Sequence, residues 1–193
     1  MSLGLLSEVA APNAKPCVFL DRDGTLIVER HYLGDPDGVE LETTVPEGLR
    51  RIQALGYILI VVSNQAGIGR GILKLAQVEE VNSRTDALLR AEGVQIQAWY
   101  HCPHEPHATC ACRKPAPGMI IHAQSKYAID MSQSLVVGDK NTDLELARNM
   151  NLRGHLVRTG YGRQHEQWAR ANDFEVHDNL GALAANLQDY LKP

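Results

Sequence analysis

The chain lacks several features that define whole classes of proteins. Its 193 residues contain no apolar run near the roughly 18 residues that span a bilayer, so a membrane-spanning helix is not expected. Basic residues are not in excess, since 19 Lys and Arg stand against 23 Asp and Glu. The resulting net charge of −4 disfavours a general nucleic-acid surface, although a local basic pocket for a small anion stays open. Aromatic side chains make up only 5% of the chain.

The N-terminus also lacks the basic start of a secretory signal, because no Lys or Arg precedes Lys15. We therefore expect a cytoplasmic protein with a loose extension over residues 1–15, followed by the rest of a single domain spanning residues 1–193. No heptad or long apolar stripe is present, which favours a monomer. A small molecule is the expected partner, with no nucleic acid and no membrane.

Short apolar runs alternate with helical patterns from Cys17 onward, as in βαβ units around a parallel sheet. The spacing of apolar residues predicts helices over residues 45–55 and 75–88, and a final helix is expected over 179–191. The expected strands are Cys17 to Leu20, Tyr57 to Val62, Ile96 to Tyr100, Leu135 to Val137, His155 to Val157 and Phe174 to Val176. The sequence therefore predicts an α/β fold.

Polar residues follow three of these strands directly. They are DRDGT at residues 21–25, SNQ at 63–65 and GDKNTD at 138–143. In an open parallel sheet such strand ends share one edge, where ligands bind. Carboxylates that are distant in sequence are therefore expected to meet there.

Asp21, Asp23 and Asp139 are the carboxylates that would converge. Like charges at short range raise one another's pKa, so their convergence is costly without a cation. Mg²⁺ removes this cost because it prefers oxygen ligands and keeps positions for water and a substrate phosphate. These residues therefore predict a magnesium site.

The same edge carries the groups needed for phosphoryl transfer. Lys114, Lys140 and the Ser63 hydroxyl can contact the phosphate oxygens. Asp21 can attack phosphorus and form an aspartyl-phosphate. Asp23 can protonate the leaving oxygen and later deprotonate the attacking water. The sequence does not exclude a hydroxyl acceptor in place of water.

Plainer interpretations of these residues also exist. The segment at residues 21–25 can be a simple turn, since Asp and Gly are common turn formers. Asp143 can stabilise the first turn of a helix that begins near Asn141, so we expect a supporting role for it. The ordered series of strand-end signals favours the catalytic interpretation.

The one long irregular stretch, residues 102–117, carries clustered metal-ligand side chains. They are Cys102, His104, Cys110 and Cys112, with His101 and His107 as competing ligands. Three sulfurs and one imidazole suit structural Zn²⁺, whereas disulfides are disfavoured in the cytoplasm. Because four protein ligands leave no open position, this zinc is expected to be structural. Arg113 and Lys114 follow directly, so zinc would also place two cations at the active edge.

The segments FLDRDGTLI, SNQAGIGRG, CRKPAPGM and GDKNTD together resemble the haloacid dehalogenase superfamily. Within it they are similar to the heptose 1,7-bisphosphate phosphatases, and histidinol-phosphate phosphatases share the metal loop. The resemblance implies a three-layer, Rossmann-like fold with a minimal cap and a zinc-binding loop. It also implies Mg²⁺-dependent hydrolysis of the C7 phosphate of a heptose bisphosphate, in the ADP-heptose route to the lipopolysaccharide core.

The resemblance further implies roles for individual residues. Mg²⁺ would bind Asp21, Asp139 and the backbone carbonyl of Asp23, while Ser63 and Lys114 would steady the phosphoryl group. Substrate would be recognised by Glu29, Arg30, His31, Tyr32, Arg113 and Lys140, with Asn64, Gln65 and Ala66 flanking the phosphate pocket. Two alternatives stay open, namely a histidinol-phosphate phosphatase and a catalytically silent, zinc-stabilised binding protein.

Overall fold

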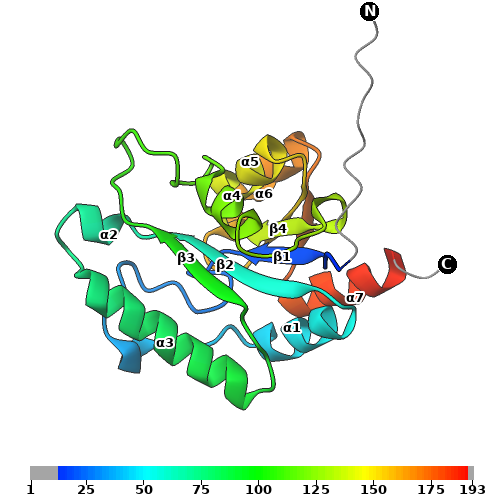
Figure 1. Ribbon diagram of the computed structural model, residues 1–193, viewed down its shortest axis with the longest axis horizontal. Coiled ribbons are helices and arrows are strands. Elements are labelled where there is room, and N and C mark those ends of the chain that lie inside the picture. The colour runs from blue at the N-terminus through cyan, green and yellow to red at the C-terminus, as the bar shows by residue number, and fades with distance from the viewer. Residues whose placement is uncertain (1–12, 191–193) are drawn as a thin grey trace, which may run out of the picture.

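A computed structural model describes residues 13–190, which form a six-stranded, all-parallel sheet flanked by helices (Figure 1). The strands lie in the order β3-β2-β1-β4-β5-β6. Their bounds are Cys17–Leu20 (β1), Ile58–Asn64 (β2), Ala98–Cys102 (β3), Leu135–Gly138 (β4), Arg153–Val157 (β5) and Glu175–His177 (β6). Because chain order reverses between β1 and β4, the carboxyl ends of these two central strands flank the crevice where open α/β sheets bind ligands.

The helices form two layers, one on each face of the sheet. Helices α1, α3 and α7 cover one face, and α4, α5 and α6 cover the other (Figure 1). The bounds are Val45–Ala54 (α1), Ala66–Gly69 (α2), Leu75–Ala91 (α3), Gly118–Gln124 (α4), Asn141–Asn149 (α5), Gly162–Ala171 (α6) and Leu180–Tyr190 (α7), with 3₁₀ turns at Pro36–Gly38 and Met131–Gln133. This arrangement confirms the predicted three-layer α/β fold.

Strand β1 shows why the sequence folds in this way. Val18 and Leu20 pack into the core beneath α1 and α7, whereas Cys17 and Phe19 pack into the core beneath α4 and α5. All four side chains are fully buried. A parallel strand that is covered on both faces is apolar at every position, which explains the continuous run CVFL.

Four strands, β2, β3, β4 and β6, end further toward the active edge than their apolar runs predict. Strand β4 ends one residue later than expected, at Gly138. Strand β2 continues through Ser63 and Asn64 because these residues pair with His101 and Cys102 of β3. Strand β3 accordingly begins at Ala98 and ends at Cys102, two residues later than expected. Strand β6 also ends one residue later than expected, at His177. Backbone pairing, which does not depend on side-chain polarity, explains the difference at β2 and β3.

The chain ends differ from expectation in smaller ways. Residues 1–12 of the expected loose extension lie outside the described residues. Lys15 is not loose, because its backbone hydrogen bonds to Ala128 (3.1 Å) and Asp130 (2.9 Å). The last helix was expected to reach Leu191, which also lies outside the described part. Across residues 13–190, no helix combines the length and the apolar character needed to cross a membrane.

Candidate active site

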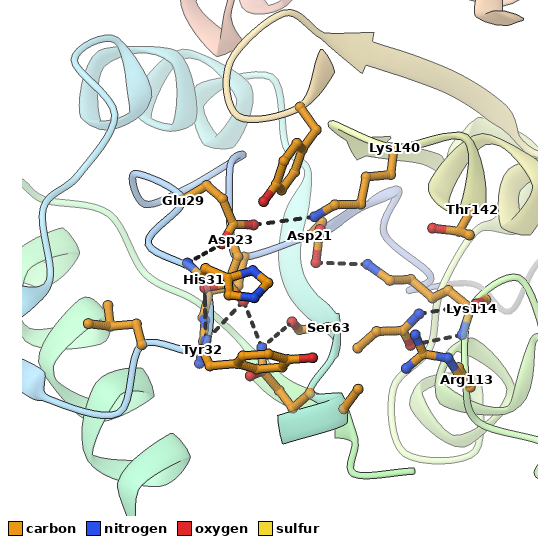
Figure 2. A pocket seen from close by; sticks show the side chains of 16 residues that line it. Asp21, Asp23, Glu29, His31, Tyr32, Ser63, Arg113, Lys114, Lys140 and Thr142 are labelled. Atoms are coloured by element: carbon orange, nitrogen blue, oxygen red, sulfur yellow. Dashed lines mark hydrogen bonds and ion pairs between the residues drawn. The ribbon is translucent and has the colours of Figure 1, made fainter. Parts of the chain in front are cut away.

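A cavity of about 310 Å³ opens at the carboxyl edge of the sheet (Figure 2). The residues predicted from the sequence that line it are Asp21, Asp23, Glu29, His31, Tyr32, Ser63, Asn64, Gln65, Ala66, Arg113, Lys114 and Lys140. Four further lining residues, Arg22, Leu33, Thr142 and Tyr161, are not among the predicted site residues. Side chains from three strand ends and two loops therefore converge on one space.

Lys114 lies at the base of this cavity between two carboxylates. Its Nζ is 2.8 Å from Asp21 Oδ1 and 2.6 Å from Asp143 Oδ1, and all three side chains are buried. Burial alone would raise the pKa of Asp21, but the charges of Lys114 and Lys140 outweigh it and hold that pKa below its usual value. Asp21 is therefore held as the carboxylate, which is the nucleophilic form.

Asp139 is held in place by backbone groups rather than by side chains. The Tyr161 backbone N–H donates to Asp139 Oδ2 at 2.8 Å. A Cβ atom at Gly24 or Gly160 would lie only 2.2 or 2.3 Å from the same oxygen. Both glycines also have positive φ angles, +78° and +54°, so the fold requires glycine at both positions. The Asp139 carboxylate therefore occupies a space that stays open only because residues 24 and 160 are glycines.

The other oxygen of Asp139 points to a cation site. Oδ1 accepts no hydrogen bond from any described residue, and the Lys140 Nζ is 3.4 Å away. Burial raises the pKa of Asp139 to about 8, because it outweighs the opposing charge of Lys140. Oxygens of Asp21, Asp139 and Asp143 all lie within 4.8 Å of one another. This donor set fits Mg²⁺, a hard ion that takes oxygen ligands.

Asp143 belongs to the support of this site. One of its oxygens pairs with Lys114, and the other accepts the Lys140 backbone N–H at 3.1 Å. The ion pair of Asp143 with Lys114, at 2.6 Å, is closer than that of Asp139 Oδ1 with Lys140, at 3.4 Å. We call Asp21, Asp139, Asp143 and Lys114 the carboxylate site.

Asp23 is held by a separate set of donors. The buried Arg22 guanidinium donates from Nη2 to both Asp23 oxygens at 2.9 Å, and its Nη1 reaches Asn82 at 2.8 Å. The Gln65 amide donates to Asp23 Oδ2 at 2.7 Å and to Ser63 Oγ at 2.8 Å. Since the Ser63 oxygen accepts this bond, its hydroxyl proton is available to a phosphate oxygen. No sequence pattern indicates the role of Arg22, because a buried arginine in a turn has no characteristic spacing.

Asn64 contributes to the site through the backbone of Lys114. Its carboxamide accepts the Lys114 backbone N–H at 2.9 Å and donates to the Lys114 carbonyl at 3.1 Å. This pair of bonds joins the end of β2 to the irregular loop across 50 positions of sequence. Asn64 therefore lines the cavity and also positions Lys114.

The segment after the first strand forms one wall of the cavity. Glu29 accepts the His31 backbone N–H at 2.7 Å and lies 3.4 Å from Lys140 Nζ. His31 and Tyr32 adopt positive φ angles of 49° and 60°, which are uncommon for such side chains. Their rings contact each other at a centroid distance of 4.5 Å. The strained turn thus directs two rings toward the cavity (Figure 2).

Arg30 does not line this wall, in contrast to the expectation that it contacts substrate. Its guanidinium pairs with Glu40 at 2.7 Å, and both side chains are largely exposed. The turn that directs His31 and Tyr32 toward the cavity leaves Arg30 on the outer surface.

The irregular loop that follows β3 brings together the predicted zinc ligands. Cys112 Sγ is 3.1 Å from Cys102 Sγ and 3.3 Å from His104 Nδ1, and Cys110 Sγ is 3.8 Å from Cys102 Sγ. Within residues 13–190, the cluster contains these four residues and neither His101 nor His107. All its cysteines are free thiols. Four such ligands can hold one zinc ion in tetrahedral geometry.

This loop is connected to the cavity through its own residues. Arg113 Nη1 donates to the His104 backbone carbonyl at 3.2 Å. An arginine that lines the cavity is thus hydrogen-bonded to the backbone of a proposed zinc ligand. We call residues 102–117 the cysteine loop.

Comparisons with known proteins agree with this geometry. Residues 111–183 match the family model described as HAD-hydrolase-like. The chain is 39% identical over 153 residues to the D-glycero-beta-D-manno-heptose-1,7-bisphosphate 7-phosphatase of Escherichia coli K12, covering 75% of this chain and 80% of that protein. It is 40% identical over 151 residues to a D-glycero-alpha-D-manno-heptose-1,7-bisphosphate 7-phosphatase of Photorhabdus laumondii, covering 74% and 82%.

A solved structure shows the same fold. The D,D-heptose 1,7-bisphosphate phosphatase of B. bronchiseptica, complexed with magnesium and phosphate, matches with a TM-score of 0.83 and 28% identity. The match covers 91% of this chain and 99% of that one. The fold and the site thus define a hydrolase of the haloacid dehalogenase class. Within that class, the chain belongs to the family of the D-glycero-D-manno-heptose-1,7-bisphosphate 7-phosphatases, which confirms the resemblance seen in the sequence.

Proposed function

We propose that this protein is a Mg²⁺-dependent phosphatase that hydrolyses the C7 phosphate of D-glycero-D-manno-heptose 1,7-bisphosphate. The observation that carries the proposal is the carboxylate site, in which Asp21 is held ionised by Lys114 and lines the cavity. A nucleophile that is buried, charged and accessible from a polar cavity suits attack on phosphorus. The family relationship supports the choice of substrate.

Magnesium would be held by Asp21, Asp139 and the backbone carbonyl of Asp23. The buried Asp139 Oδ1, which accepts no hydrogen bond from a described residue, supports this assignment. When bound, the ion neutralises charge on the phosphate oxygens and on the clustered carboxylates.

The chain's own residues then divide the reaction into two steps. An Asp21 oxygen bonds to phosphorus as the bond from phosphorus to the C7 oxygen breaks, and Asp23 gives that oxygen a proton. Water then attacks phosphorus, Asp23 takes its proton, and the bond to Asp21 breaks to release phosphate. Ser63 and Lys114 donate to the phosphoryl oxygens throughout, where charge develops in the transition state.

The rim of the cavity is suited to the rest of an anionic sugar. Arg113 and Lys140 supply positive charge, and Glu29, His31 and Tyr32 supply polar groups and ring surface. Arginine and lysine at such a rim favour a second phosphate on the substrate. The relatives include enzymes named for each of the two anomers. We propose that the residues of this rim determine which anomer this chain prefers.

We propose a structural zinc ion in the cysteine loop. The four ligand atoms support this assignment, because zinc thiolate sites take such sets. Burial raises the pKa of the Cys102 thiol to about 12, so zinc binding must displace its proton. The hydrogen bond from Arg113 to His104 would couple zinc to substrate binding.

We further propose that the enzyme acts as a cytoplasmic monomer in the ADP-heptose route to the lipopolysaccharide core. Free thiols in the cysteine loop support a reducing compartment. The exposed large hydrophobic residues in the described part are Ile72 and Leu75, three positions apart, and Ile121 on α4. So few side chains support a monomer. Light scattering of the purified chain tests the oligomeric state.

The test of the activity is phosphate release with Mg²⁺ from both anomers of the heptose bisphosphate, with histidinol phosphate beside them. Phosphorus NMR of the product distinguishes loss of the C7 phosphate from loss of the C1 phosphate. The proposal expects C7 release that Asp21→Asn abolishes. A preference for histidinol phosphate would retain the mechanism but replace the substrate. If the enzyme released phosphate from none of these compounds, the silent binding protein would be favoured.

A further inference from the structure

A second group of metal-ligating side chains lies on the outer strands β5 and β6. His155 and Glu175 are register partners across these parallel strands, and His177 is two residues beyond Glu175 on the same side of β6. The His155 Nδ1 is 3.1 Å from the His177 Nε2. The Glu175 Oε2 is 3.7 Å from the first of these nitrogens and 3.6 Å from the second. The three ligand atoms thus lie 3.1 to 3.7 Å from one another.

The group is enclosed on one side and open on the other. The His155 and His177 side chains are 1% and 4% exposed, whereas the Glu175 side chain is 45% exposed. Val157, on the same face of β5 as His155, packs in one core cluster with Leu180 of α7. The two imidazoles are therefore buried beneath α7, and the carboxylate provides the route to solvent.

A hydrogen bond between the two rings explains only part of this geometry. It accounts for the 3.1 Å contact but not for a carboxylate oxygen at nearly equal distances from both nitrogens. Ligand atoms around a tetrahedral ion with bonds of about 2.0–2.1 Å lie roughly 3.3–3.4 Å apart. The three distances here, 3.1, 3.6 and 3.7 Å, lie within about 0.4 Å of this value.

We propose that His155, Glu175 and His177 form a second metal site, which binds one divalent transition-metal ion of the zinc type. The ligand atoms are His155 Nδ1, His177 Nε2 and a Glu175 oxygen, with water completing the coordination on the exposed side. Two imidazoles and a carboxylate are a common ligand set for zinc. Magnesium is disfavoured because it prefers an all-oxygen environment.

The surroundings bear on the proton of the His177 ring. Binding through His177 Nε2 leaves the proton on its Nδ1, which is 3.4 Å from Asn186 Nδ2 of α7. Rotation of the Asn186 carboxamide by half a turn places its oxygen there, where it would accept this proton and orient the ring, as outer partners of metal-bound histidines do.

The ion would stabilise the edge of the sheet. Strand β6 has only three residues and pairs with β5 alone among the described strands. A metal shared by β5 and β6 would fasten this strand and the adjoining α7 to the sheet. Its expected effect is on unfolding of this edge and not on the turnover of substrate.

The experiment uses the full chain with one zinc ion already in the cysteine loop and with millimolar Mg²⁺ occupying the carboxylate site. Cobalt is titrated in, because Co²⁺ bound to nitrogen and oxygen ligands gives visible bands without the thiolate charge-transfer bands of a cysteine site. The proposal expects one further equivalent to bind and the melting temperature to rise. Glu175→Gln should weaken this binding about 10- to 100-fold, and His177→Gln should abolish it.

Asp178→Asn is the matched control, since Asp178 is a neighbouring, mostly exposed carboxylate that pairs with Arg158 and is not a ligand. It should leave cobalt affinity within about twofold, because it is an exposed charge. Absence of a further bound equivalent, unchanged affinity in Glu175→Gln or an equal loss in Asp178→Asn would each overturn the proposal. If His177→Gln does not fold, Glu175→Gln still tests the proposal, because the Glu175 side chain is half exposed and its replacement should not prevent folding. Its retained phosphatase activity verifies that it is folded.

Discussion

The carboxylate site and the cysteine loop meet at one cavity but are held in different ways. In the carboxylate site, buried side chains from strand ends pair with Lys114 and with backbone groups. In the cysteine loop, residues 103–117 contain no helix or strand, and its ligands contact mainly one another. The sheet therefore supplies the geometry of the first, whereas a metal must supply much of the geometry of the second.

Because of this difference, the loss of magnesium and the loss of zinc should have different effects. Loss of magnesium should remove activity and leave the fold intact, because Lys114 and Lys140 still balance the carboxylates. Loss of zinc should loosen the loop that carries Arg113 and Lys114, and so weaken both stability and activity. Lys114 belongs to both regions and connects them.

The largest expected effect is on the nucleophile. Asp21→Asn should lower kcat by at least about 10⁴-fold, a loss typical for a group that forms the covalent bond. The cysteine loop should still bind one zinc ion, because none of its ligands contacts Asp21. Phosphate release and zinc content are measured on the same preparation. Loss of zinc in this variant would show that the two regions are not separate.

The next largest effect is expected when Lys114, which belongs to both regions, is replaced. Lys114→Met should destabilise the protein by about 3–5 kcal/mol, because Asp21 and Asp143 would remain buried without their cation. Urea unfolding measures this change. Lys126→Met, at a position outside the cavity, is the control and should change stability by less than about 0.5 kcal/mol. Equal stabilities of the two variants would contradict the role given to the buried ion pairs.

Removal of zinc from the cysteine loop should have an intermediate effect. Zinc at a hundredfold excess over its Kd stabilises by about 2.7 kcal/mol, so chelation should lower Tm by roughly 5–11 °C. Activity with saturating Mg²⁺ should fall at the same time, because Arg113 and Lys114 lose their support. A calorimetric scan and a phosphate assay before and after chelation check both. Full activity in zinc-free protein would contradict the coupling.

The effect of pH on magnesium binding should be smaller than the effect of zinc removal. It should arise from the carboxylate site alone. Burial raises the pKa of Asp139 to about 8 in the absence of a cation, so below that pH the ion must displace a proton. Affinity should therefore rise up to about tenfold per pH unit as pH increases toward 8, and level off above it. The same raised pKa means that Asp139 destabilises the metal-free fold as pH rises from about 4 to 8, since the folded state binds the extra proton. Calorimetric titrations with Mg²⁺ across this range test the slope, and Asp139→Asn should remove it.

The last expected effect concerns the contact between the two regions. Asn64→Ala removes both bonds to the buried Lys114 backbone and should cost about 1–3 kcal/mol, with kcat/KM reduced about tenfold. Asn149→Ala is the control, because Asn149 donates a single, exposed bond to the Pro115 carbonyl of the same loop. It should cost less than about 1 kcal/mol. Similar kinetics in both variants would show that Asn64 does not position Lys114.

The same comparison explains how much the sequence could predict. Buried strands such as β1 appear as apolar runs, and parallel strand ends meet at one edge, so the convergence of Asp21, Ser63 and Asp139 follows from pattern alone. The clustered cysteines of the loop also have a visible spacing. The bounds of β2 and β3 did not follow, because their backbone pairing continues through polar residues.

Contacts that depend on side-chain direction in turns could not be predicted. Arg22 turns inward to Asp23, whereas Arg30 turns outward to Glu40, and both are arginines in loops. The backbone N–H of Tyr161 reaches Asp139 from a segment with no motif. Such contacts depend on local dihedral angles and packing, which residue types and spacing do not determine.

The central claim is that Asp21 carries the phosphoryl group during turnover. The most direct measurement is rapid acid quenching of the wild-type enzyme during hydrolysis of heptose bisphosphate labelled in the C7 phosphate, followed by peptide mapping. The account predicts a hydroxylamine-sensitive acyl phosphate on the peptide that contains Asp21, and its loss when unlabelled substrate is added. Label on another side chain, or undiminished phosphate release by Asp21→Asn, would contradict it.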